Sequence, residues 1–401
     1  MADPRTHRLA YVGRDGQLHV LHVDASGARK SQQLTWSLQA SPLSLWGGQG
    51  DGTTTLWPCW SPDGRSIACF VDVPSAEPGP RTHVAVVEAD GVHEHRLPPL
   101  EHRLPIHVQW SPNGARIGVL VQFEEQLELW VAEARPTPGP LRLVAEGSPL
   151  FFGWADGGDR VVLHVGDSAD EPARVEVRDL VGDGDDIVFR VPPSNFCVPF
   201  TVDCEGEERV LYVIQRDHES QLVSARIDGE DILGLGVLHG LVALVPTPDG
   251  AHVAFTAAPD ADGSPYDGIR TVSCDGRAAP EHAVDAPVLA FFWRRDHPRP
   301  MWVQWDAGRQ HIRWMVPREN SEPIEVGRCR PTRDQYFHLH FFEQFARSHA
   351  PCSADGRWLV WAGHDTHADT DGPRVFLTDL HADTPEPTAV CAGSYAVFAP
   401  C

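Results

Sequence analysis

The sequence predicts an all-β fold, namely an eight-bladed β-propeller built from four-stranded antiparallel blades. Three observations support this prediction. A short phrase returns at intervals of about fifty residues, an apolar run typical of a strand follows each copy, and helical periodicity is almost absent. The clearest copies are Trp60-Ser-Pro-Asp-Gly64 and Trp110-Ser-Pro-Asn-Gly114. Fainter copies follow at residues 154–157, 203–206, 247–250 and 352–356.

Each repeat is interpreted as a meander of four strands joined by Asp-Gly, Asn-Gly or Pro-Gly turns. The second repeat shows the layout best, with apolar runs at residues 107–110, 117–121, 127–131 and 141–144. Gly250 and Gly356 stand 106 residues apart, which is two repeats, so a degenerate repeat is expected at 289–305. A ring of seven blades is the alternative, with an insertion around residues 285–330.

The two ends of the chain are expected to share one blade. Residues 7–35 resemble strands two to four of a repeat that lacks its first strand, and residues 394–400 match a first strand. Their pairing would close the ring and remove two exposed sheet edges. The prediction is a single domain over residues 1–401, with insertions at 36–57 and 328–349.

Composition limits the partners. The formal net charge of −23 argues against a nucleic acid or an anionic membrane as partner, because those surfaces attract positive charge. No stretch is apolar enough for a signal peptide or a membrane span, so the sequence favours a cytoplasmic protein. The nine cysteines show no Cys-x-x-Cys spacing, and we interpret those in strands as small buried residues.

The repeat resembles a known family. Ser61-Pro-Asp-Gly-Arg65, followed by Ile67-Ala-Cys-Phe-Val71, is similar to the repeats of TolB-like propellers and of the N-terminal propeller of dipeptidyl peptidases and prolyl oligopeptidases. The resemblance implies a propeller over nearly the whole chain and no particular activity. The peptidases of that family act through a separate hydrolase domain, and no Gly-x-Ser-x-Gly nucleophile elbow occurs in this sequence.

The interruptions of the repeat are the predicted sites, because loops on the face opposite the Asp-Gly turns often carry function. One interruption contains the glycine-rich loop at Trp46, and the other contains a run of histidines. The predicted catalytic residues are His338, His340, Glu343 and His349, and the predicted ligands of one divalent metal ion are His340, His349, His364 and His367. His338 and His340 would share one side of a strand. The alternative is a solvated polar loop with packing histidines.

A second set of candidates comes from the first strands, which line the channel of a propeller. The residue three positions before the tryptophan of the phrase is expected to face the centre in each blade. With the neighbouring insertions, this gives the predicted ligand-binding residues Trp46, Trp57, His107, Phe151, Tyr336 and Tyr395. The alternative is that these side chains only pack the inner rim.

Two functions follow from these observations. The first is a binding scaffold that holds a small molecule, peptide or protein at the channel mouth, since the whole-chain repeat carries no recognised catalytic signature. The second is a propeller enzyme, a lyase, cyclase or hydrolase, that uses the histidine and carboxylate cluster with or without a metal. Oligogalacturonate lyase, a propeller enzyme with histidines and a metal near the channel, is an analogy for the second.

Overall fold

The computed structural model describes residues 6–24, 27, 29–35, 54–73, 81–134, 138–167, 172–182, 186–189, 191–194, 196–216, 219–258, 265–318, 321–366 and 372–400. Trp46 and its glycine-rich loop, as well as His367, lie outside these residues. Within the described part of the chain, no helix is long and apolar enough to cross a membrane.

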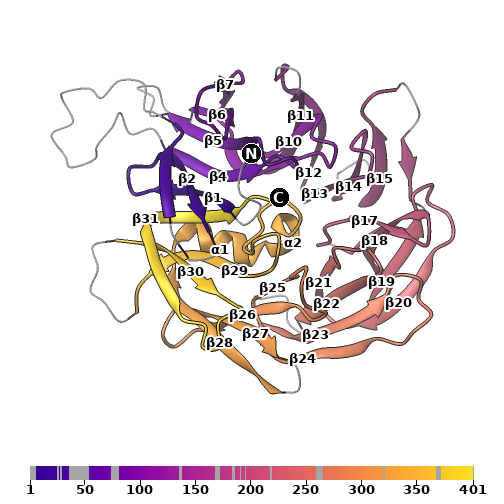
Figure 1. The fold of residues 1–401 in the computed structure, drawn as a ribbon. Helices are drawn as coiled ribbons and strands as arrows, with labels where there is room; N and C mark the ends of the chain where they lie inside the picture. The colour runs from indigo at the N-terminus through magenta and orange to yellow at the C-terminus, as the bar shows by residue number, and fades with distance from the viewer. Residues whose placement is uncertain are drawn as a thin grey trace.

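Antiparallel sheets are arranged radially around a common centre, which is the all-β propeller that the repeat predicts (Figure 1). Five sheets follow the order of the chain. Their strands are β4 (Thr54–Trp60), β5 (Ser66–Val73), β6 (Arg81–Glu88), β7 (Glu94–Arg96) and β8 (Leu100–Glu101); β9 (Leu104–Trp110), β10 (Arg116–Phe123), β11 (Gln126–Glu133) and β12 (Arg142–Gly147); β13 (Leu150–Trp154), β14 (Arg160–Val165), β15 (Arg174–Asp179) and β16 (Ile187–Val188); β17 (Phe200–Cys204), β18 (Glu207–Arg216), β19 (Glu219–Arg226) and β20 (Leu233–Leu238); and β21 (Leu241–Pro246), β22 (His252–Ala258), β23 (Tyr266–Ser273) and β24 (Glu281–Val288).

The sixth sheet joins the two ends of the chain. Its ten strands, in the order of their pairing, are β25 (Ala290–Phe292), β26 (Met301–Asp306), β27 (His311–Arg318), β28 (Ser321–Pro331), β29 (Trp358–His364), β30 (Arg374–Asp379), β31 (Pro387–Phe398), β1 (His7–Gly13), β2 (Leu18–Val23) and β3 (Arg29–Gln33). The sheet is long because β28 and β31 each pair with strands of two successive meanders. If both are counted twice, the strand order divides into eight meanders, and eight blades remain our interpretation of it.

The ring closes as the sequence predicts. The second half of β31 pairs antiparallel with β1, with Leu9 opposite Phe398 and Val12 opposite Tyr395. The first half of β31 pairs with β30. The carboxyl-terminal strand thus supplies the innermost strand beside β1, and neither strand presents an open edge there.

The repeated phrase forms a turn held by its own side chains. In the first copy, Asp63 accepts a hydrogen bond from the Ser61 hydroxyl at 2.7 Å, and Ser61 Oγ accepts one from the amide of Ser66 at 2.9 Å. Gly64 has a φ of 64°, in the left-handed region that favours glycine. Ser111 with Asn113 and Ser353 with Asp355 repeat the hydroxyl contact.

The tryptophan of the phrase links neighbouring meanders. The indole N–H groups of Trp110 and Trp293 each donate to a carbonyl in the preceding innermost strand, at Cys59 and Val245, both at 3.1 Å. Trp60 donates to Val397 at 3.4 Å and so joins the two ends of the ring. A buried indole with a hydrogen-bond partner explains why this position favours tryptophan.

Candidate functional site

The insertion before the last repeat passes through the middle of the ring. It forms two short helices, α1 (Arg333–His340) and α2 (Phe342–Phe345), which lie at the centre of the sheets (Figure 1). The insertion interrupts an innermost strand. Pro331 pairs with Gly363 before it, and Cys352 pairs with Leu359 after it, at the opposite end of β29. The chain therefore enters from one face of the ring and leaves at the face of the Asp-Gly turns.

Polar contacts tie this insertion, residues 332–349, to the surrounding strands. Thr332 donates to the Ser394 carbonyl at 2.6 Å, and Gln344 donates to the Phe152 carbonyl at 3.0 Å. The amides of Ala362 and Leu244 donate to Gln335 at 3.0 Å and to Glu343 at 2.6 Å. These contacts reach strands all around the ring, so the insertion is a fixed central plug.

Three histidines lie inside the plug region. His107 of β9, His338 of α1 and His349 after α2 are at most 1% exposed. The ring centroids of His107 and His349 lie 5.3 Å apart, and those of His338 and His349 lie 6.1 Å apart. Phe345 contacts all three rings. Burial in this aromatic surrounding lowers the pKa of each histidine, to about 3 for His349, so all three are neutral at pH 7.

Ser348 lies between two of these histidines. The Nε2–H of His349 donates to the Trp57 carbonyl at 3.4 Å, which leaves Nδ1 to accept the Ser348 hydroxyl at 2.8 Å. His107 Nε2 lies 3.5 Å from the same hydroxyl oxygen. Trp57 has a φ of 44°, an uncommon conformation for a bulky residue. The strand bulges at this point, between Leu56 and Cys59.

A cavity of about 710 Å³ opens above the plug on the face of the Asp-Gly turns. Its floor is polar and comes from one stretch of the plug, with Glu343 and Arg347 four residues apart and Gln344 and Ser348 likewise. Its walls are the ends of the innermost strands, and their aromatic residues are Trp60, Trp110, Phe152, Trp154, Phe200, Phe292, Trp293 and Phe398. The volume and the mostly apolar walls are typical of a small-molecule site.

Two ionisable groups on the floor have shifted pKa values. Burial raises the pKa of Glu343 to about 8, so this carboxyl group is mostly protonated at pH 7. Arg347 is exposed to the solvent of the cavity but enclosed by protein, and desolvation lowers the pKa of its guanidinium. Arg347 donates to the Thr201 carbonyl at 2.5 Å and lies 5.4 Å from the centre of the Phe200 ring.

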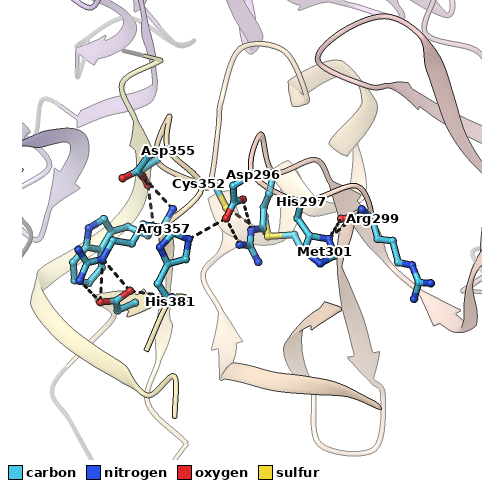
Figure 2. A network of polar contacts seen from close by, with 12 residues as sticks. Asp296, His297, Arg299, Met301, Cys352, Asp355, Arg357 and His381 are labelled. Carbon is cyan, nitrogen blue, oxygen red and sulfur yellow. Dashed lines mark hydrogen bonds and ion pairs between the residues drawn. The ribbon is translucent and has the colours of Figure 1, made fainter. Parts of the chain in front are cut away.

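A second arginine of the cavity wall is neutralised. Arg294 binds Asp296 through Nη2 at 2.5 Å and Nε at 3.0 Å. Figure 2 shows that Asp296 also faces His381, whose Nε2 lies 3.0 Å away, and that Arg357 lies nearby. Arg357 pairs with Asp379 at 2.6 Å. This network joins the turn after β25 to the turn after β30, and it keeps the Arg294 guanidinium in an ion pair with Asp296.

The histidine run is a helix, and our expectation of a strand with His338 and His340 on one side is wrong. Thr332 caps α1 by accepting from the Gln335 amide at 3.1 Å, and His338 lies on the buried side. His340 is exposed instead and stacks on Tyr336 with ring centroids 6.0 Å apart. In a helix, residues two apart point in different directions, which explains the separation.

The predicted metal ligands are spread over the fold. His340 is exposed on α1, His349 is buried in the plug, and His364 ends β29. Among the described residues, these three do not bring their ligand atoms within 4.8 Å of one another. The group that does so in that part of the chain is Glu88, Asp90 and His93, all exposed at a hairpin.

The predicted channel residues divide into two groups. Trp57, His107 and Tyr395 do meet the plug: Trp57 stacks on Phe337 with ring centroids 5.0 Å apart, and the Tyr395 hydroxyl lies 3.0 Å from His338 Nδ1. Phe151 packs on His164 and Phe196, and the cavity is lined by its neighbour Phe152.

Two cavity features were not anticipated. We expected the site on the face opposite the Asp-Gly turns, yet the cavity opens on the turn face, because the insertion crosses the ring instead of ending as a loop on the other face. Arg347 and Ser348 belong to the predicted insertion but not to the predicted site. The spacing of four residues between Glu343 and Arg347 is the signal that a helical interpretation would have used.

Comparisons with known proteins identify the fold. No protein-family model and no curated protein matches the sequence. Dihydro-heme d1 dehydrogenase NirN, in complex with DHE, is similar over 100% of this chain and 76% of its own, at 12% identity and a TM-score of 0.57. The β-propeller domain of the Trilobed protease from Pyrococcus furiosus is similar over 81% of this chain and 95% of its own, at 12% identity and a TM-score of 0.48.

TolB from Acinetobacter baumannii is also similar, at 14% identity and a TM-score of 0.38, over 68% of this chain. The match spans 62% of the TolB chain, which is less than two thirds of its length. At 12% identity, the likeness to the NirN structure shows the fold alone. The sheets themselves form the β-propeller that the resemblance to TolB-like repeats implies.

Proposed function

We propose that this protein binds a small molecule in the cavity at the turn face, with the central plug as the floor of the site. The observation that supports this most directly is the combination of a cavity of about 710 Å³, apolar walls and a polar floor supplied by a single short segment. Ligand sites typically combine this size with a few converging polar groups. A rigid ring and a fixed plug would hold those groups in place without a ligand.

A fragment screen by thermal unfolding tests this proposal. Fragments that bind the folded state raise the unfolding temperature, by an amount that corresponds to about 2.7 kcal/mol at a hundredfold excess over Kd. Ala346 lines the cavity, so Ala346→Trp should fill it and abolish the shifts. Ala278→Trp, at an exposed hairpin, is the matched control and should keep them. Shifts that survive Ala346→Trp would contradict the proposal.

The second candidate function is a hydrolase that uses Ser348 as nucleophile and His349 as base. The 2.8 Å contact between Ser348 Oγ and His349 Nδ1, at the floor of the cavity, favours it. The pKa of about 3 argues against it, because a buried imidazole that contacts only a backbone carbonyl on its other side is a weak base. Covalent labelling by a fluorophosphonate, lost in Ser348→Ala, would favour the enzyme over the binding protein.

A further inference from the structure

The cavity floor carries a cation that is not paired within the described part of the chain. Arg294, Arg295 and Arg347 line the cavity, and Arg347 is the one on its floor. Arg294 forms an ion pair with Asp296, whereas the contact of Arg347 is with a neutral carbonyl, that of Thr201. Asp156 also lines the cavity and acts on Arg347 electrostatically, but it forms no ion pair with it. The guanidinium, which faces the solvent of the cavity, is therefore free to form an ion pair with a bound anion.

The rest of the floor tolerates negative charge. Glu343, the acidic residue of the plug that lines the cavity, is mostly protonated at pH 7 and can then donate a hydrogen bond. Ser348 offers a hydroxyl group. The protein as a whole has a formal net charge of −23, so a locally cationic floor runs against the general field of the molecule. The overall composition of the protein therefore does not explain the positive charge of Arg347 on the cavity floor.

The walls of the cavity favour a ligand with an apolar part. Phe152, Phe200, Phe292 and Phe398 are each at most 4% exposed and present parts of their rings to the cavity. Trp293 is less buried and lies on the same wall. Aromatic walls favour apolar or planar ligands through burial and ring contacts.

We infer that the ligand is a small organic anion, with its apolar body between the aromatic walls and its anionic head group on the guanidinium of Arg347. This inference rests on the proposed function and adds the chemical class of the ligand. A guanidinium suits such a head group, because its fork can donate two parallel hydrogen bonds to a carboxylate, sulfonate or phosphate.

Two fluorescent probes with the same apolar body test the inference. Anilinonaphthalene sulfonate carries one anionic group, and phenyl-naphthylamine lacks it. We expect the sulfonate to bind the wild-type protein at one site, at least about tenfold more tightly than the amine. Arg347→Gln should lower the affinity of the sulfonate to that of the amine. Arg65→Gln, at an exposed turn, removes the same charge outside the cavity and should change neither affinity.

The outcomes separate the two proposals. Equal affinity of both probes, with no effect of Arg347→Gln, would overturn the anion inference and leave the cavity as a ligand site. Absence of binding by both probes would overturn the proposed function itself. If Arg347→Gln does not fold, Arg347→Lys is the replacement, because it keeps the charge but not the forked guanidinium. The inference then requires that this variant binds the sulfonate less tightly than the wild type does, but more tightly than the wild type binds the amine.

Discussion

Where a copy of the repeated phrase keeps its tryptophan, the indole N–H has a hydrogen-bond partner at some copies and not at others. Trp110 donates to the Cys59 carbonyl at 3.1 Å, whereas the indole N–H of Trp154, at the same place in its repeat, is buried without a hydrogen-bond partner. Both side chains are almost fully buried. The two positions therefore differ mainly in this hydrogen bond.

We predict that Trp110→Phe lowers the free energy of unfolding by about 1 kcal/mol more than Trp154→Phe does, because only Trp110→Phe leaves a buried carbonyl without its donor. The loss of ring volume is common to both variants and cancels in the comparison. Urea unfolding followed by tryptophan fluorescence measures both. Equal losses would show that the indole contact contributes no net stability.

Glu343 gives the site a dependence on pH. With a pKa of about 8, its carboxyl group is neutral below that pH and negative above it. Tyr266 and Cys197 are the titratable groups coupled to it, and burial raises the pKa of both above its own, so they stay neutral while Glu343 ionises.

We predict that the affinity for anilinonaphthalene sulfonate falls as the pH rises through about 8, since ionised Glu343 repels an anion in the same cavity. The sulfonate itself does not titrate in this range. Glu343→Gln should remove the dependence, because the amide oxygen can still accept from the Leu244 amide. Titrations between pH 6 and pH 10 measure it, in the range set by the shifted pKa. An unchanged fall in Glu343→Gln would assign the effect to another group.

At the scale of elements, the plug depends on how α1 begins. Thr332 is 7% exposed, and its hydroxyl group both accepts from the Gln335 amide and donates to the Ser394 carbonyl. It therefore caps the helix and fixes it to β31 at once. A helix of eight residues has little stability of its own, so such contacts decide whether it forms.

We predict that Thr332→Ala lowers the free energy of unfolding by about 1–2 kcal/mol, and that Thr332→Ser, which keeps the hydroxyl group, restores most of the loss. Chemical denaturation of the three proteins is the measurement. If Thr332→Ser is as unstable as Thr332→Ala, the methyl group and not the hydroxyl contacts holds the helix in place.

The strands could be predicted from the sequence and the plug could not, for a physical reason. Each strand lies next to a turn whose residues specify it locally, as Ser61 and Asp63 do. The buried side of α1 instead consists of Gln335, His338 and Leu339, which have helical spacing but little hydrophobicity. These polar residues can be buried because the surrounding strands supply their hydrogen-bond partners. Those strands are far away in the sequence, so a local sequence pattern gives no sign of them.

For the candidate site the same limit applies. His107 and Tyr395 could be placed at the centre, because first strands line the channel of a propeller and the repeat gives their register. The place of Arg347 could not be anticipated, since it depends on the fold bringing the Thr201 carbonyl within hydrogen-bond distance and leaving Asp156, on the same cavity, without an ion pair to the guanidinium. We predicted Phe151, whereas its neighbour Phe152 lines the cavity. An error of one residue selects the opposite face, because successive side chains of a strand point to opposite sides.

At the scale of the whole molecule, the buried histidines link the stability of the ring to pH. His107 lies on β9, whereas His338 and His349 belong to the plug, and the ring of His349 lies close to both of the other rings. All three are neutral in the folded protein because burial lowers their pKa values. In the unfolded chain they titrate near the ordinary value of about 6.5.

The sign of the effect follows from these shifts. Above pH 6.5, the ordinary histidine pKa, these residues are neutral in both the folded and the unfolded state, so their protonation costs the folded state no stability. As the pH falls toward the folded pKa of about 3 for His349, the unfolded state binds protons that the folded state excludes, so stability is lost. Each such proton contributes a slope of about 1.4 kcal/mol per pH unit.

We therefore predict that the free energy of unfolding decreases steeply below about pH 6, and that His349→Gln or His107→Gln makes this decrease shallower by about one proton. His252→Gln, at an exposed position, should leave the slope unchanged. Urea denaturation at a series of pH values gives the slope, which is independent of any constant loss of stability in the variants. If these substitutions leave the slope unchanged, the histidines take up protons in the folded protein as they do in the unfolded chain. The plug would then have to contain a counter-charge or water that stabilises the protonated histidines.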